Sequence, residues 1–132
     1  MLSSVTEPDT TIVADLEAGI GTLTRLPEGS VDVVVVVVEP TPRSIDVARR
    51  AITVAADKQQ GRILVLANKI VDDGDRERVI DGLVDFRDRY RDLVVVPNDD
   101  VVDRADREGV SPVDLDAASP AVQAIEKLIA LL

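Results

Sequence analysis

The sequence predicts an α/β fold built on a parallel, doubly wound sheet. Two observations carry this prediction: six consecutive valines, Val33 to Val38, and an alternation of short β-branched runs with amphipathic segments of helical period. An unbroken β-branched run is typical of a strand covered on both faces, in the centre of a parallel sheet. Open α/β sheets hold their ligands just past the carboxyl ends of such strands, so a site is expected after Val38.

Four strands are expected along the chain. Residues 10–14 form a short β-branched run that ends at an acid, and the valine run lies within a second strand at 31–39. Residues 62–67 and 93–96 are apolar and are followed by turn-forming residues, which predicts the third and fourth strands. About four strands with flanking helices therefore make up the predicted sheet.

Helices are expected between and after these strands. Residues 16–29 read as a loop with one helical turn, whereas Thr41 and Pro42 begin a helix that is expected to end at Gly61. The next helix follows the turn at 72–74, and its predicted apolar face is Val79, Leu83, Phe86 and Tyr90. A shorter helix is expected at 100–107. The last helix starts at Ser119-Pro120, with an expected apolar face of Val122, Ile125, Ile129 and Leu132.

Length and composition restrict the class of protein. With 132 residues, of which 45% are hydrophobic, the chain suits one domain spanning residues 1–132. Aromatic residues make up 2% and the net charge is −10, so base stacking and phosphate contacts are both disfavoured. We expect no direct nucleic-acid partner and no membrane partner. The absence of Cys and His excludes disulfides, Cys/His zinc sites, Cys nucleophiles and His bases within this chain.

The acidic balance is uneven, since 18 of the 25 acids are Asp and three of the 15 bases are Lys. This balance is typical of proteins kept soluble in concentrated salt, and it predicts a halophilic acidic protein; an ordinary acidic protein is the alternative. The sequence shows no signal peptide pattern and no apolar stretch of membrane-spanning length, so a cytoplasmic location is expected.

Asp15 is the first residue that could carry chemistry. It follows the run at 10–14 and precedes Glu17, Ala18 and Gly19, as in a Walker B element, where a carboxylate holds Mg²⁺ through its waters. The same pattern also fits a turn residue or a helix cap. A reading of Asp15 and Glu17 as a general acid/base pair has no supporting partner in the sequence.

Two further segments follow the third and fourth strands. Asn68 and Lys69 come after the third strand, where an Asn amide can pair with a purine edge. Pro97 and Asn98 come after the fourth, where backbone groups could close over a base. Taken singly, each segment also fits an ordinary turn, with a solvated Lys or a helix cap.

The order of these segments is more specific than any one of them: Asp15-Leu-Glu-Ala-Gly19, the valine strand with Glu39-Pro40-Thr41-Pro42, Asn68-Lys69, and Pro97 with its following helix. It resembles the carboxyl-terminal half of the MinD/ParA family of deviant Walker ATPases, most closely the CooC-type maturation ATPases. The resemblance covers residues 9–132. It implies a P-loop NTPase-like fold of the SIMIBI type, with ATP and Mg²⁺ as cofactors.

The resemblance also implies roles for individual residues. Asp15 corresponds to the acid on the Mg²⁺ side and Asn68 to the adenine-reading residue, with Lys69 on the base side and Pro97 and Asn98 beside the base. Glu39 and Arg43 would lie near the nucleotide edge or a dimer interface. For Arg43, an exposed residue in the first turn of a helix is an equal alternative.

The chain departs from the family in one essential part. Family members begin with a strand and a Gly-Lys-Gly-Gly-x-Gly-Lys-Thr loop that binds the phosphates, but this chain has no Gly-Lys pair. Lys58 and Lys127 fall on predicted helices, and Lys69 lies on the base side, so none replaces the loop lysine. The metal-binding cysteines of CooC-type proteins are absent too. The P-loop, or Walker A, half of the site is therefore missing.

In this family the loop-bearing strand lies between the strands expected at 10–14 and 31–39. Without it, three outcomes are open: the two strands pair directly, another polypeptide supplies the missing strand and loop, or the chain is a truncated or split gene product. We expect an ATP-binding domain without independent hydrolysis. The alternative is a non-enzymatic interaction module that pairs with a full-length ATPase or a target protein. A homodimer, or a partner chain supplying the P-loop half, would complete either arrangement.

Overall fold

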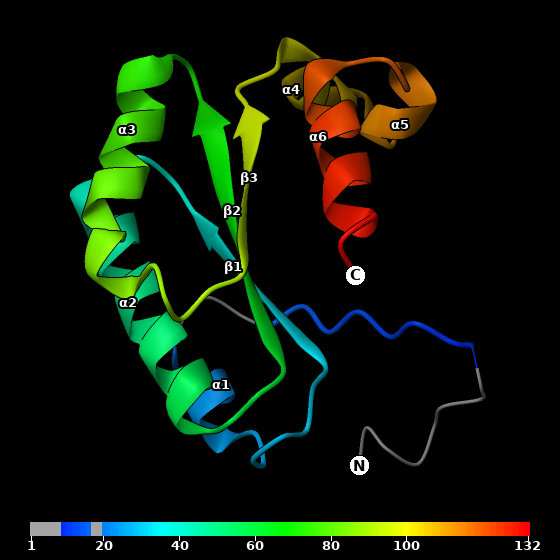
Figure 1. The fold of residues 1–132 in the computed structure, drawn as a ribbon. Coiled ribbons are helices and arrows are strands. Elements are labelled where there is room, and N and C mark those ends of the chain that lie inside the picture. The colour runs from blue at the N-terminus through cyan, green and yellow to red at the C-terminus, as the bar shows by residue number, and fades with distance from the viewer. Residues whose placement is uncertain (1–8, 17–19) are drawn as a thin grey trace.

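In the part of the chain that the structure describes, three strands form a parallel sheet in the order β1-β2-β3. In the computed structural model, which describes residues 9–16 and 20–132, these are β1 (Val33–Val38), β2 (Arg62–Ile70) and β3 (Asp92–Pro97). Helices flank the sheet on both faces (Figure 1). The predicted α/β class with a parallel sheet is confirmed, and the architecture is consistent with a P-loop NTPase-like fragment.

Six α-helices and one 3₁₀ turn surround the sheet in the described part of the chain. In order they are α1 (Ile20–Arg25), α2 (Pro42–Asp57), α3 (Asp73–Gly82), η2 (Val84–Phe86), α4 (Asp100–Glu108), α5 (Pro112–Leu115) and α6 (Pro120–Ile129). Helices α2 and α3 lie on one face of the sheet, and α6 lies on the other (Figure 1). None of the described helices is long and apolar enough to cross a membrane.

The core is divided between the two faces of β2, because successive side chains of a strand point to opposite sides. Ile63, Val65 and Ala67 belong to the larger cluster with α2 and α3. Leu64 and Leu66 belong to the smaller cluster, which β3 and α6 complete. All five side chains are buried, so the strand with cover on both faces is β2.

The valine run is not the central strand, and that expectation is wrong. β1 lies at an edge of the sheet, where it pairs with β2 alone among the described residues. Val36 and Val38 are buried against α2, but Val35 and Val37 are 36% and 55% exposed. The reason is that α6 packs on β3 and β2 and reaches β1 only at Val33.

The strand expected at 10–14 is also absent from the sheet. Residues 10–16 are exposed and belong to no helix or strand, and Val13 is 84% exposed. A strand persists through hydrogen bonds to a neighbouring strand, and the strand expected between this run and β1 is missing from the sequence. Direct pairing of the two runs does not occur in the structure. Glu17, Ala18 and Gly19 lie outside the described residues.

Two helices differ from their predicted form. α3 ends at Gly82 and continues as the 3₁₀ turn η2, although Leu83 and Tyr90 are buried as expected. In α6 the expected apolar face is wrong, because of its four residues only Val122 is buried. Ala121, Ala124 and Leu128 face the sheet instead. Small alanine side chains let the helix axis approach the strands, so size decides which of two apolar stripes is buried.

Candidate functional site

Three loops meet at the edge formed by the carboxyl ends of the strands. Because all three strands are parallel, their carboxyl ends reach the same edge, at the top of Figure 1. Glu39 follows β1, Asn68 and Lys69 lie at the end of β2, and Pro97 ends β3. The structure therefore brings together the base-side residues that the sequence analysis selected.

A β-bulge shapes the end of β2. The register between β2 and β3 shifts between Ala67 and Ile70, so Asn68 and Lys69 lie within the strand instead of after it. Lys69 has a positive φ of 57°, in the left-handed region that non-glycine residues seldom adopt. Asn68 is half-buried and Lys69 is exposed. Residues with strained backbone conformations cluster at functional sites, so the bulge favours a functional role for this edge of the sheet.

An ion pair joins the ends of β1 and β2. The Nζ atom of Lys69 lies 2.9 Å from Oε1 of Glu39. The hydrogen bond and the charge of Glu39 raise the pKa of Lys69 above its ordinary value of 10.5, and the charge of Asp103 on α4 adds to the effect. Both side chains of the pair remain substantially exposed, so salt will screen it.

The loop after β1 is fixed by hydrogen bonds that follow from its sequence. The Glu39 amide donates to the Ser44 hydroxyl at 2.9 Å, and the Ser44 amide donates to Oγ1 of Thr41 at 3.2 Å. Thr41 thereby caps α2, which begins at Pro42 as predicted. Arg43 is exposed in the first turn of this helix. The carboxylate of Glu39 is thus placed by a rigid loop.

The loop after β3 is tied to the bulge and to α6. The backbone amide of Asn98 donates to the Ile70 carbonyl at 2.8 Å, and this bond joins the two loops. Asn98 itself is exposed. Asp99 accepts from the Val101 amide at 2.9 Å and from the Ala121 amide at 3.0 Å. These two bonds, with a smaller contribution from Ser119, hold the pKa of Asp99 below its ordinary value.

The hydrogen bond between Asp99 and α6 is the feature that sequence reasoning missed. The position of Asp99 before a helical segment signals an N-cap of α4, and Asp99 does cap that helix. The second bond spans 22 residues to the first turn of α6, and no local pattern in the sequence reports it.

Asp15 is not brought to this edge. It is exposed, and its segment, residues 9–16, runs across the lower half of Figure 1, away from the carboxyl ends of the strands. Among the residues that the structure describes, no group of three or more acids is placed to hold a metal ion. A role for Asp15 in binding Mg²⁺ stays a prediction.

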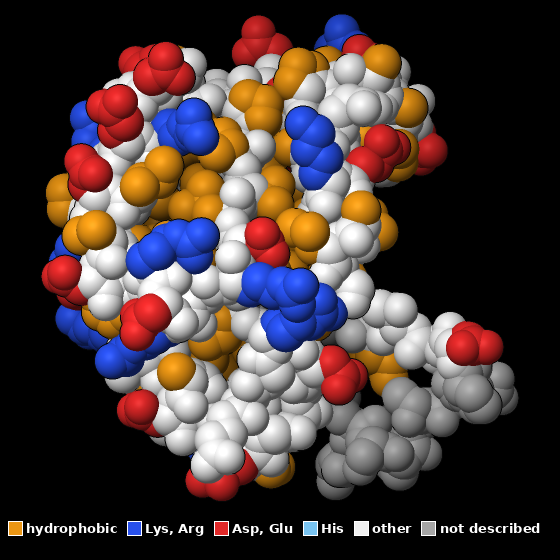
Figure 2. All heavy atoms as spheres, in the orientation of Figure 1, with side chains coloured by type: hydrophobic (Ala, Val, Ile, Leu, Met, Phe, Trp, Pro, Cys, Tyr) orange, Lys and Arg blue, Asp and Glu red, His pale blue; other side chains and the backbone are white. Residues whose placement is uncertain are grey.

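The residues at this edge suit one part of a nucleotide and not the other. Asn68 offers an amide with both a donor and an acceptor, and half-buried Pro97 offers an apolar surface, which together fit a base. Among the described residues, no lysine of this edge is free to bind the phosphates. The Lys69 ammonium is paired with Glu39, and acidic side chains gather over the neighbouring α3 (Figure 2). The described residues of this edge therefore fit the base of a nucleotide, and they do not provide a site for its triphosphate and Mg²⁺.

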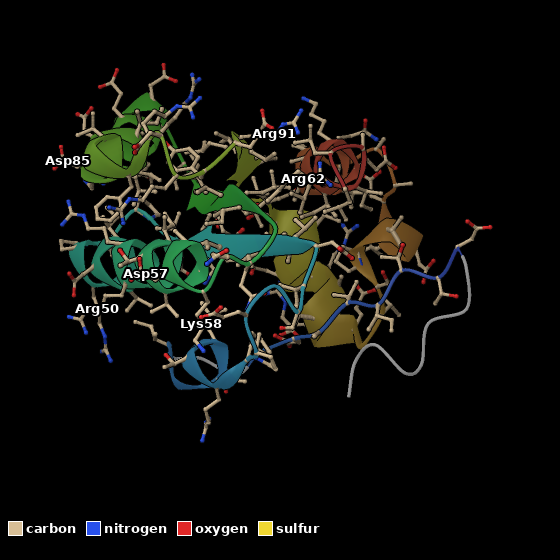
Figure 3. All side chains as sticks on the ribbon, turned by 60° about the horizontal axis from the view of Figure 1, so that its bottom comes forward. Arg50, Asp57, Lys58, Arg62, Asp85 and Arg91 are labelled. Atoms are coloured by element: carbon tan, nitrogen blue, oxygen red, sulfur yellow. The ribbon has the colours of Figure 1, made fainter. Side chains whose placement is uncertain are left out.

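The remaining lysines lie far from this edge. The Lys58 ammonium donates to the Leu26 carbonyl at 2.8 Å, beside α1 at the opposite end of the sheet (Figure 3). Lys127 is exposed on α6. An apolar hollow of about 500 Å³ is also remote, since it lies between α1, α2 and η2 and none of the selected residues lines it.

A comparison with known proteins finds a relative of part of this chain. No known family profile matches the chain. The chain is 32% identical over 107 residues to a protein described as "Carbon monoxide dehydrogenase accessory protein CooC" from Rhodospirillum rubrum. The match covers 81% of this chain but 39% of that protein. The chain is thus similar to part of a CooC protein and spans well under half of its length.

Proposed function

We propose that this chain is a CooC-like, MinD/ParA-type ATP-binding domain that is degenerate or split and does not hydrolyse ATP alone. The observation that supports this most directly is the joined carboxyl edge. There the bulge with Asn68 and Lys69 contacts the loops that hold Glu39 and Asn98. The similarity to CooC supplies the class of ligand.

The base side of the proposed site consists of Asn68, Lys69, Pro97 and Asn98. The bulge turns the chain at Asn68, whose amide would pair with the exchangeable edge of a purine. Pro97 would pack against the face of the base, while the bond between Asn98 and Ile70 fixes the spacing of the two loops. Lys69, held by Glu39, would border the site without reaching a phosphate.

Phosphoryl transfer depends on positioning and on neutralising charge around the transferred group. The chain has no phosphate-binding loop, and its net charge is −10. Hydrolysis by this chain alone is therefore expected to be negligible. Asp15 would take part in Mg²⁺ binding only where a partner supplies the phosphate half. A role in carrying metal through thiolates is excluded, because the sequence contains no Cys.

Calorimetric titration with adenosine and with Mg²⁺-ATP in concentrated KCl tests the proposal. We expect both ligands to bind weakly and saturably with similar affinity, because the phosphates of ATP would add little binding free energy. Asn68→Ala should weaken binding about tenfold, the effect of one lost hydrogen bond. Gln123→Ala, an exposed amide on α6, is the matched control and should leave affinity unchanged. Binding of ATP far tighter than adenosine, or steady hydrolysis, would contradict the proposal.

A second candidate is a non-enzymatic interaction module. It is favoured by the exposed edge strand β1, an uncovered surface of the kind used for pairing with another chain. A folded chain that binds no nucleotide, together with an unchanged affinity for protein partners after Asn68→Ala, would favour the module over the nucleotide-binding domain.

A further inference from the structure

The chain leaves β2 through Val71, an exposed residue whose side chain does little to hold it in place. Val71 follows Ile70, the last residue of β2, and is 73% exposed. The bulge just before it contains Asn68 and Lys69, which belong to the base side of the proposed site. Because the Val71 side chain has little packing, the path of the chain at the exit of the bulge depends on backbone hydrogen bonds.

The carboxylate of Asp75 on α3 accepts such a bond. Its Oδ2 atom accepts from the Val71 amide at 3.1 Å, and its Oδ1 atom accepts from Nη1 of Arg78 at 2.7 Å. The side chain of Asp75 is 19% exposed, whereas that of Arg78 is 54% exposed. A hydrogen bond to an ionised acceptor is stronger than one between neutral groups. Asp75 therefore holds the chain where it leaves the bulge.

The carboxylate of Asp75 is not the N-cap of α3. That cap is Asp72, whose side chain accepts from the Asp75 amide at 2.8 Å. In an ordinary capping box, the third residue of the helix bonds back to the amide of the N-cap residue itself. Here the third residue, Asp75, bonds instead to the amide of Val71, one residue earlier. This bond joins α3 to the end of β2, at the top of Figure 1.

The bulge is held by contacts from three different elements. The Lys69 ammonium pairs with Glu39 after β1, and the Ile70 carbonyl accepts from the Asn98 amide after β3. The third contact is the bond to Asp75 on α3. The side chains of the ion pair are 61% and 42% exposed, so concentrated salt screens their attraction. The better shielded bond to Asp75 is less affected, and it is the contact that persists in salt.

We infer that Asp75 is a positioning residue of the proposed base site. Through the Val71 amide it fixes the exit of the bulge, and with it the direction of the Asn68 side-chain amide. A bulge that is free to move must be ordered when a base binds, which lowers affinity. The inference rests on the proposed function, because that function is what gives Asn68 a base to contact.

Three variants test this inference by calorimetric titration with adenosine in concentrated KCl. Asp75→Ala removes both bonds and should weaken adenosine binding about tenfold. Asp75→Asn keeps one oxygen for the Val71 amide but loses the charge that pairs with Arg78. It should therefore bind like the parent chain, although its Tm falls. Asp73→Ala removes an acid from the same turn of α3 and is the matched control, which should bind normally.

The comparison of affinity with Tm separates positioning from a general effect on stability. Circular dichroism checks that each variant folds, and thermal unfolding gives its Tm. Affinity that falls in step with Tm across the three variants would overturn the inference. Affinity of Asp75→Ala equal to that of the parent chain would overturn it as well, and would leave the proposed function intact.

A second measurement does not depend on nucleotide. In the free chain, the NMR signals of the Asn68 side-chain amide should shift in Asp75→Ala and stay near their parental positions in Asp75→Asn and Asp73→Ala. Unmoved Asn68 signals in Asp75→Ala would refute the positioning role. Shifted signals in a chain that binds no adenosine would support the positioning of Asn68 by Asp75 and count against the proposed function alone.

Discussion

The Lys69 ammonium lies 2.9 Å from the Glu39 carboxylate. The backbone of Lys69 has a φ of 57°, in the left-handed region. The pair connects the ends of two adjacent strands across the bulge. An exposed ion pair contributes little to stability, while a left-handed conformation is costly for a residue with a Cβ atom. The geometry of Lys69 is therefore maintained by the surrounding strands more than by its own interactions.

Lys69→Gly and Lys69→Ala separate these two effects. Both variants lose the ion pair, but only glycine adopts a positive φ without strain. We expect Lys69→Gly to have a Tm several degrees above that of Lys69→Ala and close to that of the parent chain. Thermal unfolding followed by circular dichroism measures the difference. Equal Tm values for the two variants would show that the bulge carries no strain.

Glu39→Gln should lower the pKa of Lys69 toward 10.5, since Glu39 is the main cause of its elevation. A raised pKa stabilises the folded state at pH values below the unfolded value, and that contribution is lost as the pH rises through the folded value. The parent chain should thus lose slightly more stability above pH 10.5 than Glu39→Gln does. Urea unfolding near neutral pH and above pH 10.5 measures this, and high KCl should remove the difference.

Asp99→Ala should destabilise the chain more than a single cap substitution does, because Asp99 accepts bonds from the first turns of two helices. Its lowered pKa stabilises the folded state above pH 3.8, and this contribution is lost as the pH falls through the folded value. Asp99→Asn should therefore show a weaker decline in Tm on acidification. Asp106→Asn, an exposed acid on α4, is the control. A pH profile of Asp99→Asn that matches the parent would contradict the assignment.

Gly61→Ala should be severely destabilising. A Cβ atom at Gly61 would overlap the backbone carbonyl of Asp32, at the point where the Gly61 amide bonds the Val31 carbonyl at 2.9 Å. Relieving the overlap requires a shift of backbone at the start of β1, with a cost of about 1 to 3 kcal/mol or more. Gly21→Ala, in the helix α1, should instead be neutral or stabilising, because a Cβ atom there would meet only the end of the Arg25 side chain, at 3.7 Å. Chemical denaturation compares the two.

Local patterns predicted the parts of the fold that depend on local chemistry. The cap at Thr41 and the start of α2 at Pro42 follow from residue type, and the structure has them. The position of the valine run within the sheet did not follow. Its composition reports that it suits burial on both faces, whereas its actual cover depends on which strands and helices are present to pack against it.

The candidate site at the carboxyl edge of the sheet was also predicted only in part. Asn68, Pro97 and Asn98 were found because they follow apolar runs, and parallel pairing then brings them to one edge. The bulge could not be found, because it arises from the register between β2 and β3 and not from any local residue pattern. The strand expected before Asp15 is not formed for a related reason, because a strand needs a hydrogen-bonded neighbour that is distant in sequence.

The hydrogen bonds of Asp99 connect this edge of the sheet to α6. The Asp99 carboxylate accepts hydrogen bonds from the first turn of α4 and from the first turn of α6, and Asp99 lies directly after the loop residues Pro97 and Asn98 in the chain. A ligand that displaces this loop must either break one of those bonds or carry the start of α6 with it. The amide of Ala121, on the far side of that bond, is therefore a natural reporter of occupancy, readable by its NMR chemical shift without labelling the ligand.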